Sequence, residues 1–200
     1  MKLRAAKADR RTHHGDLQSL IDAHKSSQRP CMNCATQCSQ CGSHTCSCEC
    51  SANCKHAAQQ LSQEPERYPI EAYIVPLVYA LTSSGVFQPF WSCQGHADAN
   101  GEVYRLPQVW FYANSQVHVQ LLIKTLSALT AQQVLAPDSN WQINLTYSDD
   151  ELLPAYSLAP HPTASTVPDL VGLQQEIPII AEQISKLWQV AVEKLGPDPV

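Results

Sequence analysis

Eight of the nine cysteines in this 200-residue chain lie within 24 residues of one another, and they are its strongest chemical signal. They are Cys31, Cys34, Cys38, Cys41, Cys46, Cys48, Cys50 and Cys54. The stretch holds only three other apolar residues, so burying a core cannot offset the entropy lost on folding. Four thiolates suffice for one tetrahedral zinc or one cubane iron–sulfur cluster. The spacing therefore predicts a metal-folded segment, residues 31–56, with two metal centres.

The identity of the metal stays open between zinc, or another d10 ion, and an iron–sulfur cluster. The run Cys46-x-Cys48-x-Cys50 resembles metallothionein, in which alternate cysteines share several d10 ions. The run Cys34-x3-Cys38-x2-Cys41 has the cluster spacing of radical S-adenosylmethionine enzymes, but no alternating βα units follow it. The segment also lacks the apolar residues that shield an iron–sulfur cluster. Zinc is therefore the favoured cofactor, with an iron–sulfur cluster as the alternative.

A second group of reactive side chains surrounds the ninth cysteine, in the run Ser-Cys-Gln-Gly-His at residues 92–96. Gly95 allows the backbone to turn sharply, so His96 can fold back towards Cys93. The two side chains are candidate metal ligands, or a catalytic pair in which the imidazole activates the thiol. The alternative is a small buried cysteine beside a hydrogen-bonded loop histidine. Asp98 and Arg105 are close in sequence, and His118 is the other histidine expected inside the domain.

The run SSGVFQPFWSCQGH, followed by a turn and a strand, resembles bacterial and phage proteins of uncharacterised role that carry Ser-Cys-x-Gly-His after a helix. It is also similar, more distantly, to the wybutosine tRNA methyltransferases, whose Ser-Ser-Cys-Ser-Gly-Arg motif has a comparable place. The resemblance covers about residues 70–120, and it implies Ser92, Cys93 and Gly95 as site positions. His96 stands where that family has Arg, and Trp91 where it has the first Ser.

Charge and hydropathy restrict the partners that the chain can take. Residues 1–30 hold seven Lys/Arg against three Asp/Glu, whereas residues 68–200 hold four against twelve. A nucleic-acid partner is therefore expected only through the basic N-terminal arm. No apolar run is long enough for a signal peptide or a membrane span, so we expect a cytoplasmic protein without membrane contact. A protein partner or a small molecule remains open.

The elements that must position these residues follow from apolar periodicity and turn signals. We expect a helix in residues 70–85 that Pro76 starts or kinks, two neighbouring strands joined at Asn100-Gly101, and a helix capped by Asn114 or Ser115. A third strand at residues 140–148, a short fourth at 155–158 and a final helix interrupted by Pro178 complete the pattern. This order predicts an α+β fold, a mainly antiparallel sheet covered by helices.

Four regions result: a basic arm (1–30), the cysteine segment (31–56), a linker (57–69) and the α+β domain (70–200). The favoured function is that of a metal-binding accessory protein with a ligand or partner site at Cys93 and His96. The alternatives are an enzyme that uses these two residues, on RNA or a nucleotide, and metallothionein-like metal storage.

Overall fold

Two strands of 11 residues each, β1 (Phe87–Ala97) and β2 (Val103–Ala113), form an antiparallel hairpin in the computed structural model. The structure describes residues 10–27, 64, 67, 69–147, 154–162 and 168–195.

At the hairpin turn, the carboxylate of Asp98 accepts hydrogen bonds from the backbone N–H groups of Asn100 and Glu102. The bond from Glu102 is the main cause of the lowered pKa of Asp98. The two predicted strands and their turn are confirmed.

Two further strands complete the sheet, β3 (Trp141–Tyr147) and β4 (Pro154–Pro160). The strand order is β1-β2-β4-β3, and each neighbouring pair is antiparallel. β1 is therefore an edge strand, and β4 lies between β2 and β3. The predicted α+β class with an antiparallel sheet is confirmed.

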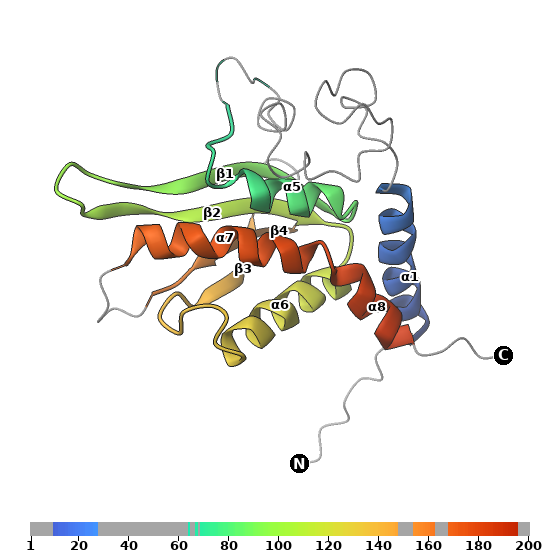
Figure 1. Ribbon diagram of the computed structural model, residues 1–200. Helices are drawn as coiled ribbons and strands as arrows, with labels where there is room; N and C mark the ends of the chain where they lie inside the picture. Colours follow the sequence, from blue (N-terminus) through green and yellow to red (C-terminus); the bar gives the residue numbers. More distant parts are fainter. Residues whose placement is uncertain are drawn as a thin grey trace, which may run out of the picture.

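Three helices, α5 (Val75–Ser83), α6 (Gln116–Ala131) and α7 (Leu170–Ile184), cover one face of the sheet (Figure 1). α5 has a proline at its first turn, where the missing N–H costs nothing, so Pro76 starts the helix. The Ser115 hydroxyl caps α6 by accepting a hydrogen bond from the His118 N–H. Beneath the helices, Val109, Phe111 and Leu158 of the sheet are fully buried.

The final helical region is interrupted at a different place from the one predicted. Pro178 lies inside α7 without ending it, and the break comes at Ser185, before α8 (Leu187–Leu195). Pro178 is exposed, so water can hydrate the carbonyl group that lacks its helical donor. At the true break, the N–H of Lys186 bonds to the carbonyl of Gln183, one residue short of the α-helical spacing.

A helix near the N-terminus, α1 (Arg10–Ser27), packs against α8 at the other end of the chain (Figure 1). Its Leu20 and Ile21 are buried, and the ring of His24 stacks on Trp188 with centroids 4.2 Å apart. His118 of α6 lies beneath α1, where its Nε2 is 2.7 Å from the carbonyl oxygen of Asp16. Among the described residues, no helix is long and apolar enough to cross a membrane.

Candidate metal centre and ligand groove

The candidate site is built around Cys93, which is 3% exposed on edge strand β1. Cys93 and His96 are three positions apart, and a regular strand would point their side chains to opposite faces. Gly95 lies between them with φ +85°, a conformation that breaks this alternation. Cys93, His96 and Glu71 consequently bring one thiol, one ring nitrogen and one carboxylate oxygen within 4.8 Å of one another.

Glu71 reaches the site from the segment that precedes α5. Its Oε1 lies 2.9 Å from Nε2 of His96, and its Oε2 accepts a 2.7 Å hydrogen bond from the backbone N–H of Gln94. Both oxygens of the carboxylate are thereby directed at β1. The loop before α5 and the strand that carries Cys93 and His96 are fixed to each other through this one side chain.

Gln94 adds a second contact to the segment before α5 and ties the site to α7. Its side-chain carbonyl accepts a hydrogen bond from the N–H of Tyr73, and its backbone carbonyl accepts one from the Gln174 amide of α7. Gly95 packs closely as well, since a Cβ placed there would lie 2.6 Å from Cδ1 of Leu170 and 2.9 Å from Cδ of Pro107. The segment before α5, helix α7 and strand β2 therefore hold residues 94–95 in place.

Burial and the neighbouring groups act in opposite directions on the pKa of the Cys93 thiol. Burial raises the pKa of Cys93, and the carboxylate of Glu71 adds to this rise. The N–H of Gly95, 3.4 Å from the sulfur, and the guanidinium of Arg105 oppose it. Burial is the largest of these effects, so the pKa of the thiol is higher than that of an ordinary cysteine.

This electrostatic setting suits a metal ligand better than a nucleophile. A nucleophilic cysteine needs a lowered pKa, whereas a bound metal itself drives loss of the proton from a coordinating thiol. Thiolate, imidazole and carboxylate are the three ligand types that bind zinc, at about 2.0–2.3 Å each. Tetrahedral geometry then places ligand atoms roughly 3.4–3.6 Å apart, and the three ligand atoms here all lie within 4.8 Å of one another.

A groove of about 720 Å³ opens beside the three side chains. Cys93 and His96 line it, together with Phe90 and Trp91 of β1 and Arg105 of β2. Pro69, Ile70, Glu71, Glu64 and Arg67 contribute from the segment before α5. Three protein ligands beside an open cavity are typical of metal sites that leave one coordination position for a ligand.

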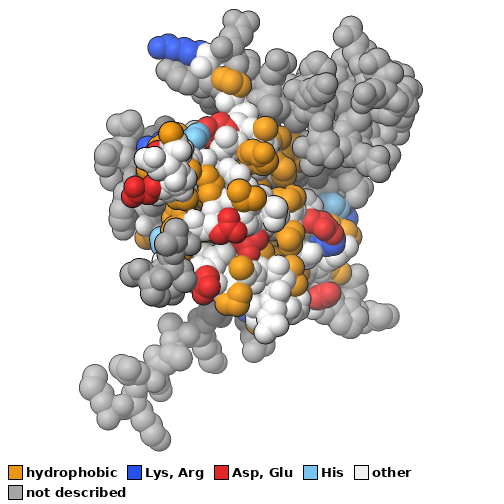
Figure 2. All heavy atoms as spheres, turned by 60° about the vertical axis from the view of Figure 1, so that its left-hand side comes forward, with side chains coloured by type: hydrophobic (Ala, Val, Ile, Leu, Met, Phe, Trp, Pro, Cys, Tyr) orange, Lys and Arg blue, Asp and Glu red, His pale blue; other side chains and the backbone are white. Residues whose placement is uncertain are grey.

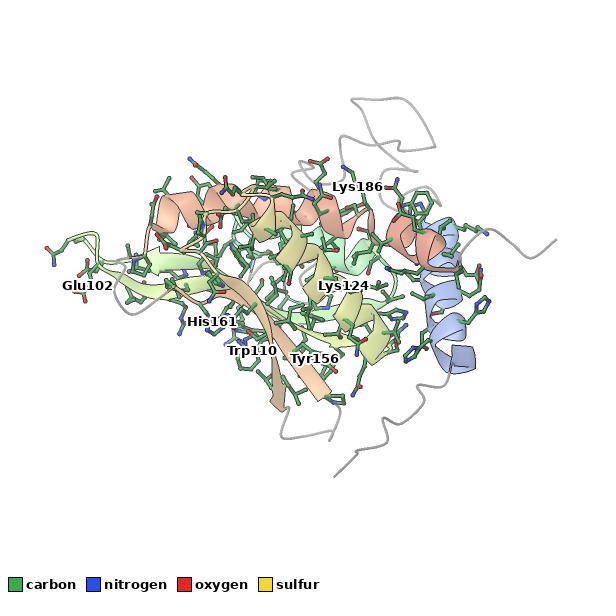
Figure 3. All side chains as sticks on the ribbon, turned by 90° about the horizontal axis from the view of Figure 1, so that it is seen from below. Glu102, Trp110, Lys124, Tyr156, His161 and Lys186 are labelled. Carbon is green, nitrogen blue, oxygen red and sulfur yellow. The ribbon has the colours of Figure 1, made fainter. Side chains whose placement is uncertain are left out.

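An irregularity in β1 gives the groove its aromatic wall. Between Pro89 and Trp91 the register to β2 shifts by one residue, so Phe90 and Trp91 both contact Trp110. The centroid distances to Trp110 are 6.2 Å for Phe90 and 5.6 Å for Trp91. Both rings stay substantially exposed, at 46% and 38%. Figure 3 labels Trp110 on the sheet, and it shows Glu102 far away at the tip of the hairpin.

The structure brings together some of the residues singled out from the sequence and separates others. Cys93, His96, Ser92 and Arg105 all line the groove, whereas Asp98 lies in the hairpin turn and His118 beneath α1. The cysteines from Cys31 to Cys54 lie outside the described residues, and so does the linker between the segment and residue 64. Their predicted metal centres stay predictions.

Glu71 is the site residue that sequence reasoning missed. One signal pointed to it: Glu71 is the only Lys, Arg, Asp or Glu between Arg67 and Asp98. A single carboxylate in such an apolar stretch needs a hydrogen-bonding or charged partner when it is buried. The sequence did not show that this partner is His96, 25 positions further on.

Comparisons with protein-family models, with curated proteins and with solved structures give no match for this chain. The fold and the site therefore define only a class: an α+β domain with a Glu-Cys-His cluster at the mouth of an aromatic groove. The resemblance of residues 70–120 to Ser-Cys-x-Gly-His proteins stays an expectation.

Proposed function

We propose that this protein is a cytoplasmic metal-binding accessory protein whose α+β domain holds one divalent transition metal, preferably zinc, between Glu71, Cys93 and His96. The observation that carries this proposal is the approach of their three ligand atoms to within 4.8 Å, from two separate segments of the chain. The contact between the Glu71 carboxylate and the His96 ring occupies the centre in the metal-free state. When metal binds, it replaces this contact, and the Cys93 thiol releases its proton to solvent.

Residues 31–54 hold two further centres, zinc-type or iron–sulfur, according to the same proposal. Support for this part comes from the number and spacing of the eight cysteines. The two kinds of centre differ in their surroundings. The cysteine segment supplies mainly thiolates, whereas the domain supplies one thiolate, one imidazole and one carboxylate beside a groove. A small molecule or a protein partner then binds at the groove.

The test must separate the domain centre from the cysteine segment. A full-length variant with all eight segment cysteines replaced by serine retains Glu71, Cys93 and His96 as its proposed metal ligands. We expect this octa-serine variant to bind about one equivalent of zinc or cobalt(II). Cobalt gives a thiolate charge-transfer band and visible d–d bands that report the ligand set. Adding His96→Gln or Glu71→Gln should abolish stoichiometric binding.

The matched control is His161→Gln in the same octa-serine background. His161 is an exposed histidine of the described domain that contacts Asn144, and it lies apart from the groove. This control should keep its one equivalent of metal, and circular dichroism should show that every variant is folded. Absence of stoichiometric metal in the folded octa-serine variant would overturn the domain centre. Metal retained at full stoichiometry by Cys93→Ser would remove Cys93 from the proposed ligand set.

A further inference from the structure

The aromatic wall of the groove offers a surface on which a flat ring can stack. Phe90 stacks on Tyr112 with centroids 4.6 Å apart, so one side of its ring is supported and the other remains available. Trp91 contacts Trp110 and remains 38% exposed beside Phe90, with the Arg105 guanidinium over its ring. Supported aromatic rings that stay exposed at a cavity wall are suited to planar ligands, because stacking needs a fixed ring with a free face.

A cation lies next to this wall. The guanidinium carbon of Arg105 is 5.9 Å from the centroid of Trp91, and the same side chain interacts with the thiol of Cys93. Arg105 therefore stands between the aromatic surface and the candidate metal centre. Guanidinium groups bind phosphate with two parallel hydrogen bonds, so this position suits an anionic group attached to a planar ring.

The size and charge of the domain favour a small ligand over a nucleic acid. A groove of about 720 Å³ falls within the roughly 300–1,000 Å³ range of small-molecule sites. Residues 68–200 hold twelve Asp/Glu against four Lys/Arg, which disfavours a long polyanion. On the face shown in Figure 2, acidic side chains are scattered among hydrophobic and neutral ones. Arg105 is one of those four cations, and it lies at the groove.

We propose that the groove binds a nucleoside monophosphate, with its base on Phe90 and Trp91 and its phosphate between Arg105 and the open position of the metal. The inference rests on the proposed function only for the contact with the metal. Stacking and the Arg105 contact use residues outside the Glu71, Cys93 and His96 cluster. Nucleotide binding and metal binding can therefore be measured separately, and either can be absent without the other.

Calorimetric titration of the zinc-loaded full chain with adenosine monophosphate tests this assignment. Adenosine and inorganic phosphate, titrated separately, should each bind at least about tenfold more weakly, because each keeps only one of the two contacts. Arg105→Gln and Trp91→Leu should each weaken the nucleotide by about tenfold or more. Matched controls are Lys124→Gln on α6, which Figure 3 shows on the helical side, and Tyr73→Leu, an exposed ring that does not line the groove. Both should bind like the unmodified protein.

Three results would overturn the assignment: no binding of adenosine monophosphate, equal binding of adenosine, or unchanged affinity in Arg105→Gln and Trp91→Leu. A single-stranded oligoadenylate that binds far more tightly than the mononucleotide, with the same dependence on Arg105, would replace it with an RNA site. If His96→Gln removes the metal and leaves nucleotide binding dependent on Arg105, the groove assignment stands. If the chain binds the metal but not adenosine monophosphate, the nucleotide assignment is wrong and the proposed metal-binding function is unaffected.

Discussion

Gly95 is the residue on which the geometry of the site depends. Its positive φ interrupts the alternation of β1, and its missing side chain leaves room for Leu170 and Pro107. Two independent physical reasons therefore require glycine here: the backbone conformation and the close approach of α7 and β2. Cys93 and His96 meet Glu71 because of this one position.

Replacement of Gly95 by alanine should destabilise the protein by about 2–5 kcal/mol. About 1–2 kcal/mol comes from a non-glycine residue at positive φ, and about 1–3 kcal/mol from crowding against Leu170 and Pro107. Urea denaturation followed by circular dichroism measures the free energy of unfolding. Gly101→Ala is the matched control, because φ is +84° and a Cβ there meets nothing within 4 Å. It should lose only about 1–2 kcal/mol, and equal losses in the two variants would disprove the role of crowding.

At the scale of elements, one buried carboxylate joins α7 to the sheet. Glu176 is 7% exposed, and its Oε2 accepts a 2.7 Å hydrogen bond from the indole N–H of Trp141 in β3. Its Oε1 accepts a hydrogen bond from the backbone N–H of Ala136, in the loop between α6 and β3. Glu176 serves as a structural link, apart from the groove, and it helps to fix the helix that supports Gly95.

Glu176→Gln should lower the free energy of unfolding by about 1–3 kcal/mol. Glutamine has one acceptor oxygen for two donors, the buried indole of Trp141 and the part-buried N–H of Ala136, so one of them loses its partner. Chemical denaturation gives the free energy, and the fluorescence of Trp141 reports its surroundings. Glu182→Gln on the same helix is the control, because Glu182 pairs with Lys186 at the surface. Its stability should stay within about 0.5 kcal/mol of the unmodified protein; an equal loss in both variants would contradict the role of burial.

At the scale of the whole molecule, the first and last described helices pack on each other. α1 and α8 are more than 150 residues apart in sequence, yet Leu20 is buried and His24 stacks on Trp188. Burial lowers the pKa of His24 below that of an ordinary histidine. The folded state therefore resists protonation of this ring more than the unfolded state does.

This depressed pKa predicts that the packing of α1 weakens in mild acid. Above the ordinary histidine pKa of about 6.5, both states are neutral and the stability is complete. As the pH falls below about 6.5, the unfolded state takes up the proton first, so stability decreases until the folded-state pKa is passed. Hydrogen exchange of the α1 amides between pH 7.5 and pH 5, corrected for intrinsic rates, measures the effect. These two pH values are chosen about one unit or more on either side of the ordinary histidine pKa.

The control for this prediction is His24→Phe, which keeps a ring against Trp188 and removes the titrating group. Its α1 protection should depend less on pH than that of the unmodified protein. Equal pH dependence in the two proteins would assign the effect to another group.

Much of the fold was predictable because local signals agree with it. Pro76 starts α5, Ser115 caps α6, and Asn100-Gly101 lies in the turn between β1 and β2. The break between α7 and α8 was predicted wrongly at Pro178, because the sequence does not show that this proline is exposed. The strand order was not predictable either. It places β4 between β2 and β3, and such long-range pairing depends on which faces the helices bury.

The sequence by itself determined the types of residue available for chemistry: a cysteine segment, and Cys93 and His96 with Gln94 and Gly95 between them. It also determined the α+β class, because apolar periodicity and turn residues are local properties. The tertiary structure decided that Glu71 completes the cluster and that Phe90, Trp91 and Arg105 line a groove beside it. These contacts join segments distant in sequence across the edge of a sheet. No local pattern encodes them, because they depend on how the helices pack and on the backbone conformation at Gly95.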